Sequence, residues 1–135
     1  MNKNILEIKS YDARGYKPQI DFEKWRVALL NHVKAMSVKQ IEKIERHMLT
    51  DEVFVLLRGN GYLVLARDKD RTPKNITAVK MEKHKIYNVR KAAWHGVVAD
   101  KAIKILIVEN RNTSKSNSEY HLLTEKQQIQ LKKII

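Results

Sequence analysis

The sequence predicts an all-β fold, a small barrel or sandwich, with an N-terminal arm and one short C-terminal helix. Several short segments alternate apolar with polar residues or are rich in valine, isoleucine and phenylalanine, which is typical of strands. The run Gly59-Asn60-Gly61 predicts a hairpin turn between two of these segments, because glycine and asparagine accept positive φ at low cost. With 135 residues the chain suits one domain with one core, and we assign residues 1–135 to it.

The strands are expected within a barrel core of about residues 24–110. Residues 1–22 include Gly15 and Pro18 and show no sustained period, which predicts an arm or a short strand. The alternation that starts at Trp25 favours a strand, and Trp25 itself is expected in the core. The other predicted strands are 41–47, 52–57, 62–67, 77–81, 85–89, 94–98 and 104–109.

One helix is expected near the C-terminus, over about residues 124–133. Thr124 can cap its start, and Gln127 follows three residues later at the spacing of a capping box. Leu123, Gln127 and Leu131 recur on one face of this helix. That face is therefore expected to pack against the barrel.

Composition and charge exclude several classes of protein. No apolar run approaches the ~20 residues that span a bilayer, and the first residues lack the apolar segment of a signal peptide, so we expect a cytoplasmic protein. The absence of cysteine excludes disulfides, thiolate catalysis and cysteine-ligated zinc. The net charge of +12 comes from 27 basic residues that are spread along the chain. We therefore expect a solvated basic surface and no main role in binding nucleic acid.

A histidine, a glutamate and a glycine stand at a recognisable spacing in the middle of the chain. Glu52 follows His47 by five residues, and Gly59 follows Glu52 by seven. This spacing resembles the first motif of the cupin superfamily, which runs His-x-His, Glu and Gly. The first histidine position is Glu45 here, and the leading glycine position is Lys39.

The second cupin motif is represented mainly by Trp94-His95. Its proline position is Arg90 and its second glycine position is Ala92. The resemblance covers roughly residues 40–110. It implies a cupin-type double-stranded β-helix, also called a jelly-roll barrel, but the superfamily includes many activities, so the fold does not specify a reaction.

The resemblance implies a metal site made of His47, Glu52 and His95, with Glu45 as a fourth ligand. Two imidazoles and a carboxylate suit one divalent transition metal, such as Fe, Mn, Ni or Zn. The loss of one motif histidine favours a metal-free pocket over a metal-loaded one. In a metal-free pocket His47 and His95 could act as general acid or base, or each could be a hydrogen-bonded structural residue.

Four further side chains are expected to contact a ligand: Phe54, Tyr87, Arg90 and Trp94. Phe54 shares the strand face of Glu52. Arg90 could hold a carboxylate or phosphate through a bidentate fork, and Trp94 could stack on a sugar or other ring. The alternatives are an exposed turn arginine at position 90, a Tyr87 that only closes a turn, and a Trp94 that only packs over the next residue.

The sequence thus predicts a barrel protein that binds a small polar or anionic metabolite, such as a sugar derivative or a carboxylate. If it converts this metabolite, it would be a metal-dependent isomerase, epimerase, lyase or oxygenase. The sequence is compatible both with an enzyme and with a protein that only binds. The alternative is a non-catalytic binding or interaction protein with a vestigial, metal-free pocket. The extended N-terminal segment and the need to cover sheet edges predict a homodimer.

Overall fold

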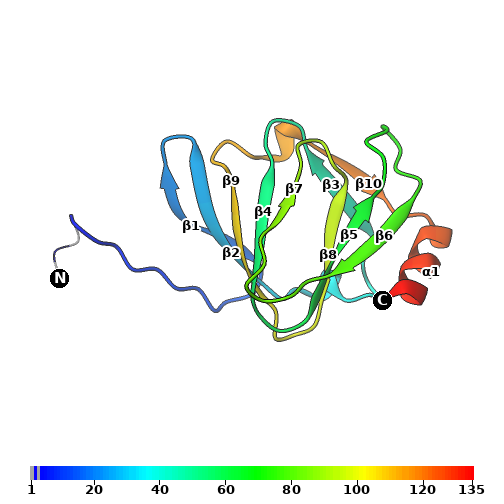
Figure 1. Cartoon of the computed structure of the whole chain (residues 1–135), viewed down its shortest axis with the longest axis horizontal. Helices are drawn as coiled ribbons and strands as arrows, with labels where there is room; N and C mark the ends of the chain where they lie inside the picture. Colours follow the sequence, from blue (N-terminus) through cyan, green and yellow to red (C-terminus); the bar gives the residue numbers. More distant parts are fainter. Residues whose placement is uncertain (1, 3) are drawn as a thin grey trace.

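Two antiparallel β-sheets of five strands each form the body of the protein (Figure 1). The structure is a computed structural model that describes residue 2 and residues 4–135. Sheet A has the order β1-β2-β9-β4-β7, with the bounds Tyr16–Phe22, Trp25–Asn31, Lys104–Asn110, Glu52–Arg58 and Tyr87–Val89. Sheet B has the order β10-β3-β8-β5-β6, with the bounds Ser118–Leu122, Lys43–His47, His95–Ala99, Gly61–Ala66 and Ile76–Lys80.

The predicted all-β class is confirmed, and each strand expected in the barrel core is present. The segment that the sequence predicts as an arm or a short strand contains both, because β1 follows an extended arm. Strand β10 has no counterpart among the predicted strands. Two short 3-10 helices, η1 (Lys34–Met36) and η2 (Lys115–Asn117), connect strands.

The turn at Gly59 is present, but the predicted hairpin pairing of its two flanking strands is wrong. Gly59 has a φ of 81°, and a Cβ there would lie 2.6 Å from the backbone nitrogen of Ile103, so the position requires glycine. Asp100 holds the turn by accepting hydrogen bonds from the backbone and side-chain amides of Asn60. Strand β4 pairs with β7 and β9, whereas β5 pairs with β6 and β8. The turn therefore carries the chain from sheet A to sheet B.

The larger apolar core lies between the two sheets. Its buried members are Ala28, Met36, Phe54, Leu56, Leu63, Met81, Val89, Ala99, Ile103, Ile105 and Ile107. They come from strands of both sheets and from the loops that join them. This core fills one part of the space between the sheets, and the candidate site occupies another.

A second core forms on the outer face of sheet B, under the C-terminal helix α1 (Glu125–Ile134). The predicted capping box is confirmed: Thr124 and Gln127 each accept a hydrogen bond from the backbone N–H of the other. Leu131 is fully buried and packs with Trp94 in this second core. Among the described residues, no helix has both the length and the apolar character needed to cross a membrane.

The outer face of sheet A carries apolar side chains that no other element of the described chain covers. We call these residues the outer patch: Phe22, Trp25, Val27, Leu29, Val53, Val55, Leu57, Leu106 and Val108. Trp25 is 46% exposed and its ring lies 5.8 Å from that of Phe22, so its expected place in the core is wrong. The reason is strand register, which directs its neighbours Arg26 and Ala28 inward and Trp25 outward.

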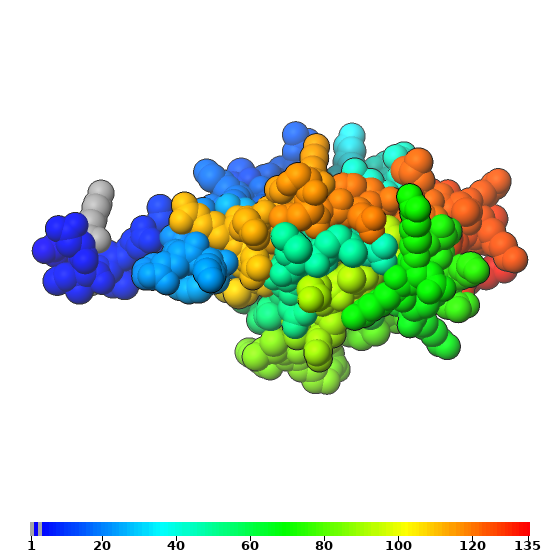
Figure 2. Space-filling view, turned by 90° about the horizontal axis from the view of Figure 1, so that it is seen from above, coloured from blue at the N-terminus to red at the C-terminus, as the bar shows by residue number. Residues whose placement is uncertain are grey.

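The N-terminal arm projects away from this body, beyond β1 (Figures 1 and 2). Its base is anchored by the buried Asn31, whose side-chain amide donates hydrogen bonds to the carbonyls of Tyr11 and Ala13 at 3.0 and 2.7 Å. The outer part of the arm presents Ile5 and Ile8, which are 82% and 81% exposed.

Candidate metal centre and cavity

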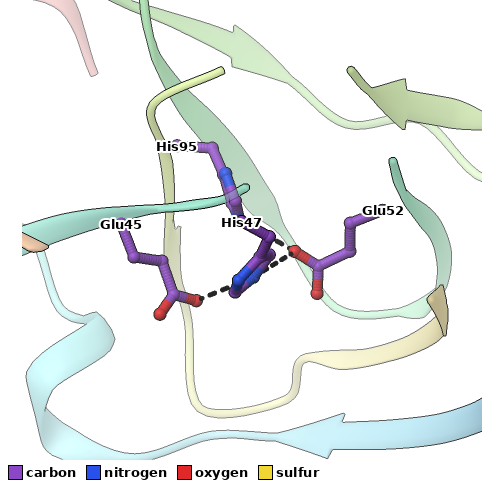
Figure 3. A group of neighbouring side chains, drawn as sticks. All are labelled: Glu45, His47, Glu52 and His95. Atoms are coloured by element: carbon purple, nitrogen blue, oxygen red, sulfur yellow. Dashed lines mark ion pairs between the residues drawn. The ribbon is translucent and has the colours of Figure 1, made fainter. Parts of the chain in front are cut away.

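Four titratable side chains converge between the two sheets (Figure 3). Glu45 and His47 point inward from β3, His95 from the neighbouring β8, and Glu52 from β4 of the facing sheet. One ligand atom from each residue lies within 4.8 Å of all the others. The convergence follows from the strand pleat, because residues 45 and 47 share a face and Glu45 is directly opposite His95 in the ladder.

Three of the four side chains are almost fully buried. The side chains of His47, Glu52 and His95 are 8%, 6% and 3% exposed, whereas that of Glu45 is 39% exposed. The Oε1 atom of Glu52 lies 3.1 Å from Nε2 of His47 and 2.8 Å from Nε2 of His95. The carboxylate of Glu45 is 3.6 Å from Nε2 of His47.

Hydrogen bonds at the far side of each ring determine which nitrogen carries the proton. Nδ1 of His95 lies 3.0 Å from the carbonyl of Ala93, which can only accept, so this nitrogen donates. Nδ1 of His47 lies 2.8 Å from the hydroxyl of Ser118, which already donates its hydrogen to the carbonyl of Ser114 at 2.7 Å. This Nδ1 therefore also donates. In the neutral rings, both Nε2 lone pairs face the carboxylate of Glu52.

Two atoms of the cluster have chemistry that suits an adjacent positive charge. Oε1 of Glu52 and Nε2 of His95 are both buried, and neither has an aligned hydrogen bond in spite of their short separation. Two lone pairs that face each other in a buried place repel unless a cation lies between them. A divalent metal ion meets that requirement, and the donor set fits one.

Protons on the rings are the other way to balance the charge. Burial by itself would lower the pKa of His47 and of His95, but the adjacent Glu52 outweighs burial and raises both pKa values above the usual range. Burial likewise opposes ionisation of Glu52, yet the two adjacent histidine rings, when protonated, donate to its carboxylate and attract its charge, and so lower its pKa to about 2. In the absence of a metal, the cluster is therefore an ionic group of two histidines and a carboxylate.

Two residues next to the cluster were not among those expected from the sequence, Glu109 on β9 and Tyr16 on β1. The Tyr16 hydroxyl donates a hydrogen bond to Oε1 of Glu109 at 2.5 Å. Burial, and then the charge of Glu52, raise the pKa of Glu109 to about 7. A signal for Glu109 is present in the sequence, since it continues the inward-facing positions Ile105 and Ile107 and so carries a carboxyl group into the core.

The cluster opens into a cavity of about 630 Å³ between the sheets. Phe54 lines this cavity, and its ring lies 5.8 Å from that of His95. Arg26, Lys43 and Lys115 bring positive charge to the cavity wall.

The structure places the other three expected ligand contacts outside this cavity. Trp94 is buried on the opposite face of sheet B, where its indole N–H donates to the carbonyl of Asp70 at 2.7 Å and the Arg46 guanidinium lies 4.5 Å from its ring. The side chain of Arg90 is 76% exposed. The hydroxyl of Tyr87 accepts a hydrogen bond from a backbone N–H. Strand alternation explains why Trp94 lies outside the cavity, because adjacent residues point to opposite faces and the next residue, at position 95, points inward.

The two facing sheets with a histidine and glutamate cluster between them are those of a cupin jelly roll, and solved structures agree. A cupin-2 domain protein from Shewanella frigidimarina aligns with a TM-score of 0.54 at 18% identity, over 75% of this chain and 85% of its own. A cupin superfamily protein from Desulfitobacterium hafniense aligns with a TM-score of 0.52 at 12% identity, over 73% and 81%. The expected cupin fold is confirmed.

Within the cupins, residues 6–130 match the family model of ureidoglycolate lyase, and the chain belongs to that family. The curated Ureidoglycolate lyase 2 of Rhizobium meliloti is 27% identical over 92 residues, which are 67% of this chain. The match spans 56% of the length of that relative. A Streptomyces nucleoside dehydratase shares the fold with a TM-score of 0.55 at 7% identity, over 86% of each chain.

Proposed function

We propose that the protein is a metal-dependent lyase that acts on a small hydroxy acid of the ureidoglycolate type. The observation that carries the proposal is that Nε2 of His95 and Oε1 of Glu52 are both buried 2.8 Å apart with no aligned hydrogen bond, while Nε2 of His47 lies 3.1 Å from the same oxygen. The family membership supports the reaction class. Lys43 and Lys115 at the cavity wall, together with a bound divalent ion that would offset the charge of the glutamates there, support an anionic substrate.

In this proposal His47, His95 and Glu52 hold the metal, and Glu45 completes the ligand set. The Ser118 hydroxyl and the Ala93 carbonyl fix the two rings through their Nδ1 atoms, as outer partners of metal-binding histidines usually do. A bound divalent ion would supply Lewis acidity toward the oxygen atoms of the substrate. Glu45 stands where the cupin motif has a histidine and still offers a ligand oxygen, so the substitution keeps a donor in place.

Cleavage of a ureidoglycolate breaks the bond between its hydroxyl-bearing carbon and the ureido nitrogen. The hydroxyl proton leaves, the oxygen electron pair forms the carbonyl of glyoxylate, and the electron pair of the broken bond goes to nitrogen. That nitrogen takes up a proton and leaves as urea. The chain must therefore accept one proton and deliver one, and we assign this exchange to Glu109, whose pKa of about 7 is near neutrality, with the Tyr16 hydroxyl as its hydrogen-bond donor at the cavity wall.

A non-catalytic binding protein is the second candidate, and one observation favours it. The raised pKa values of His47 and His95 allow protons to balance the charge of Glu52 without any metal. Such a pocket would bind an anionic metabolite and release it unchanged.

Metal analysis and turnover together separate the two candidates. Purified protein, loaded in turn with Mn, Fe, Ni and Zn and then desalted, should retain about one equivalent of its preferred metal per chain. It should also release glyoxylate and urea from ureidoglycolate. His95→Ala and Glu52→Gln should lower metal affinity by at least about tenfold, whereas the exposed His84→Ala should not. If the protein retains less than about one-tenth equivalent of every metal and turns over no ureidoglycolate, the lyase proposal is wrong and the non-catalytic binding protein is the remaining candidate.

We also propose that the protein forms a homodimer in which the outer patches of two copies pack together and each arm lies along the partner. Four seven-residue strands, ~4.8 Å apart and rising ~3.3 Å per residue, offer a face of roughly 450 Å². A standard interface buries about 800 Å² per protomer, so the face alone is too small. The exposed apolar side chains of the arm, Ile5, Leu6 and Ile8, supply further area. A second copy covers both surfaces at once, because each copy carries both.

A further inference from the structure

The cavity continues from the charged cluster into an apolar region. On each of three strands that bear a charged site residue, the neighbouring inward-facing residue is apolar. These residues are Phe54 beyond Glu52, Val97 beyond His95 and Ile107 beside Glu109, and all of them line the cavity. The charged cluster therefore lies at one end of the cavity, and apolar side chains surround the part of the cavity next to it.

Further apolar side chains line the cavity farther from the cluster. Leu30 from the end of β2, Val33 from the loop that follows and Met36 from η1 all line the cavity. Leu30 is opposite Ile105 in the ladder, whereas Arg26, near the other end of the same strand, is opposite Glu109. The apolar region therefore extends along the strands, from the residues of the charged cluster toward the Leu30 end of β2.

The volume of the cavity exceeds what ureidoglycolate needs. Ureidoglycolate has about nine non-hydrogen atoms, and at the ~30 Å³ that each water molecule occupies in the liquid it would fill no more than roughly 270 Å³. The cavity holds about 630 Å³. Ureidoglycolate would therefore occupy less than half of this volume, and much of the remaining lining is apolar, so an apolar group fits that part of the cavity better than water does.

We propose that the physiological substrate is a hydroxy acid of the ureidoglycolate type whose nitrogen leaving group carries an apolar substituent of several carbon atoms. This inference rests on the proposed function for the placement of the acid group at the charged cluster. The hydroxyl and carboxylate lie at the metal end, and the substituent lies along Phe54, Val97 and Ile107 toward Leu30. Ureidoglycolate, which has no apolar substituent, would then still be cleaved but would bind more weakly than such a substrate.

A series of 2-hydroxy acids tests the apolar region directly. Glycolate, 2-hydroxybutanoate, 2-hydroxyhexanoate and 2-hydroxyoctanoate would be titrated into the metal-loaded and the metal-stripped protein by calorimetry. Each added methylene should strengthen binding by about two- to fourfold until the region is full. An affinity that does not change with chain length in either form would overturn the inference.

Two substitutions on β2 provide a matched pair. Leu30 faces the cavity and Leu29 faces the outer patch, so Leu30→Trp fills the apolar region while Leu29→Trp leaves it open. Leu30→Trp should weaken binding of 2-hydroxyoctanoate at least about tenfold relative to glycolate, and Leu29→Trp should leave that ratio unchanged. Equal ratios in the two variants would count against the apolar region.

Failure of the proposed function gives a different result from failure of this inference. If the cluster binds no metal and splits no ureidoglycolate, the increase of affinity with chain length still appears in the stripped protein and the apolar region stands. If the protein binds metal and cleaves ureidoglycolate, but its affinity for 2-hydroxy acids does not change with chain length, the proposed lyase function is supported and the proposed apolar substituent is ruled out.

Discussion

At the scale of single residues, the site depends on how its two histidines are held. Each ring is fixed through Nδ1, one by the Ser118 hydroxyl and one by the Ala93 carbonyl, before any ligand binds. Nδ1 is thereby the protonated nitrogen of each neutral ring, and Nε2 is presented to the Glu52 carboxylate as a lone pair. A ring with the opposite tautomer would point a hydrogen at the place of the cation.

Ser118→Ala tests this orientation without removing a ligand. The Nδ1 atom of His47 would lose its acceptor, so we expect metal affinity to fall by about ten- to a hundredfold while the circular dichroism spectrum stays the same. Metal affinity would be measured by competition with a coloured chelator. Ser116→Ala is the control, because the Ser116 hydroxyl bonds only to Ser114 and does not touch the site. Equal affinities in the two variants would contradict the role of Ser118.

At the scale of elements, local sequence predicted strands better than it predicted their partners. The apolar runs in 52–57 and 62–67 mark both strands, and the glycine turn between them is present. Strands distant in the sequence determine their pairing, because β7 and β9 occupy both sides of β4. The Ile103 backbone and the Asp100 carboxylate, which direct the turn, are about forty residues away in sequence and no local pattern could reveal them.

The second cupin motif also shows how backbone geometry can survive a change of residue. Ala92 occupies a glycine position of the motif, and its φ of 66° lies in the left-handed region that favours glycine. Its backbone N–H donates to the carbonyl of His47 at 2.8 Å, which connects this turn to the end of β3. The contact explains how a degraded motif still places His95 beside His47.

The C-terminal helix is expected to stabilise sheet B without taking part in the site. Leu131 is fully buried against the outer face of that sheet, so Leu131→Ala should lower the free energy of unfolding by about 3 kcal/mol. Ile129, which is 47% exposed on the same helix, is the matched control, and Ile129→Ala should change it by less than about 0.5 kcal/mol. Urea denaturation would measure both. A loss of metal affinity in folded Leu131→Ala protein would contradict the separation of helix and site.

At the scale of the whole molecule, the arm and the outer patch are the surfaces that a partner copy would cover. Sedimentation equilibrium should give a mass of twice the 15.8 kDa chain at micromolar concentration. Trp25→Lys in the outer patch and Ile8→Asp in the arm should each shift the protein toward the monomer, because a charge in the interface must be desolvated. Leu122→Lys, at a 72% exposed position of sheet B, should not. A monomeric parent protein, or dissociation by Leu122→Lys alone, would refute the proposed interface.

Local sequence was sufficient to predict the strand class, the capped C-terminal helix and the spacing of His47, Glu52 and Gly59. These features depend on apolar patterning, capping and turn chemistry, which act over a few residues. The three-dimensional arrangement was needed to show which strands pair, that Trp94 faces away from the cavity while Phe54 faces into it, and that Glu109 and Tyr16 lie beside the cluster. A cavity between two sheets is assembled from strands far apart in the chain, and its lining follows register and twist, which no short segment encodes.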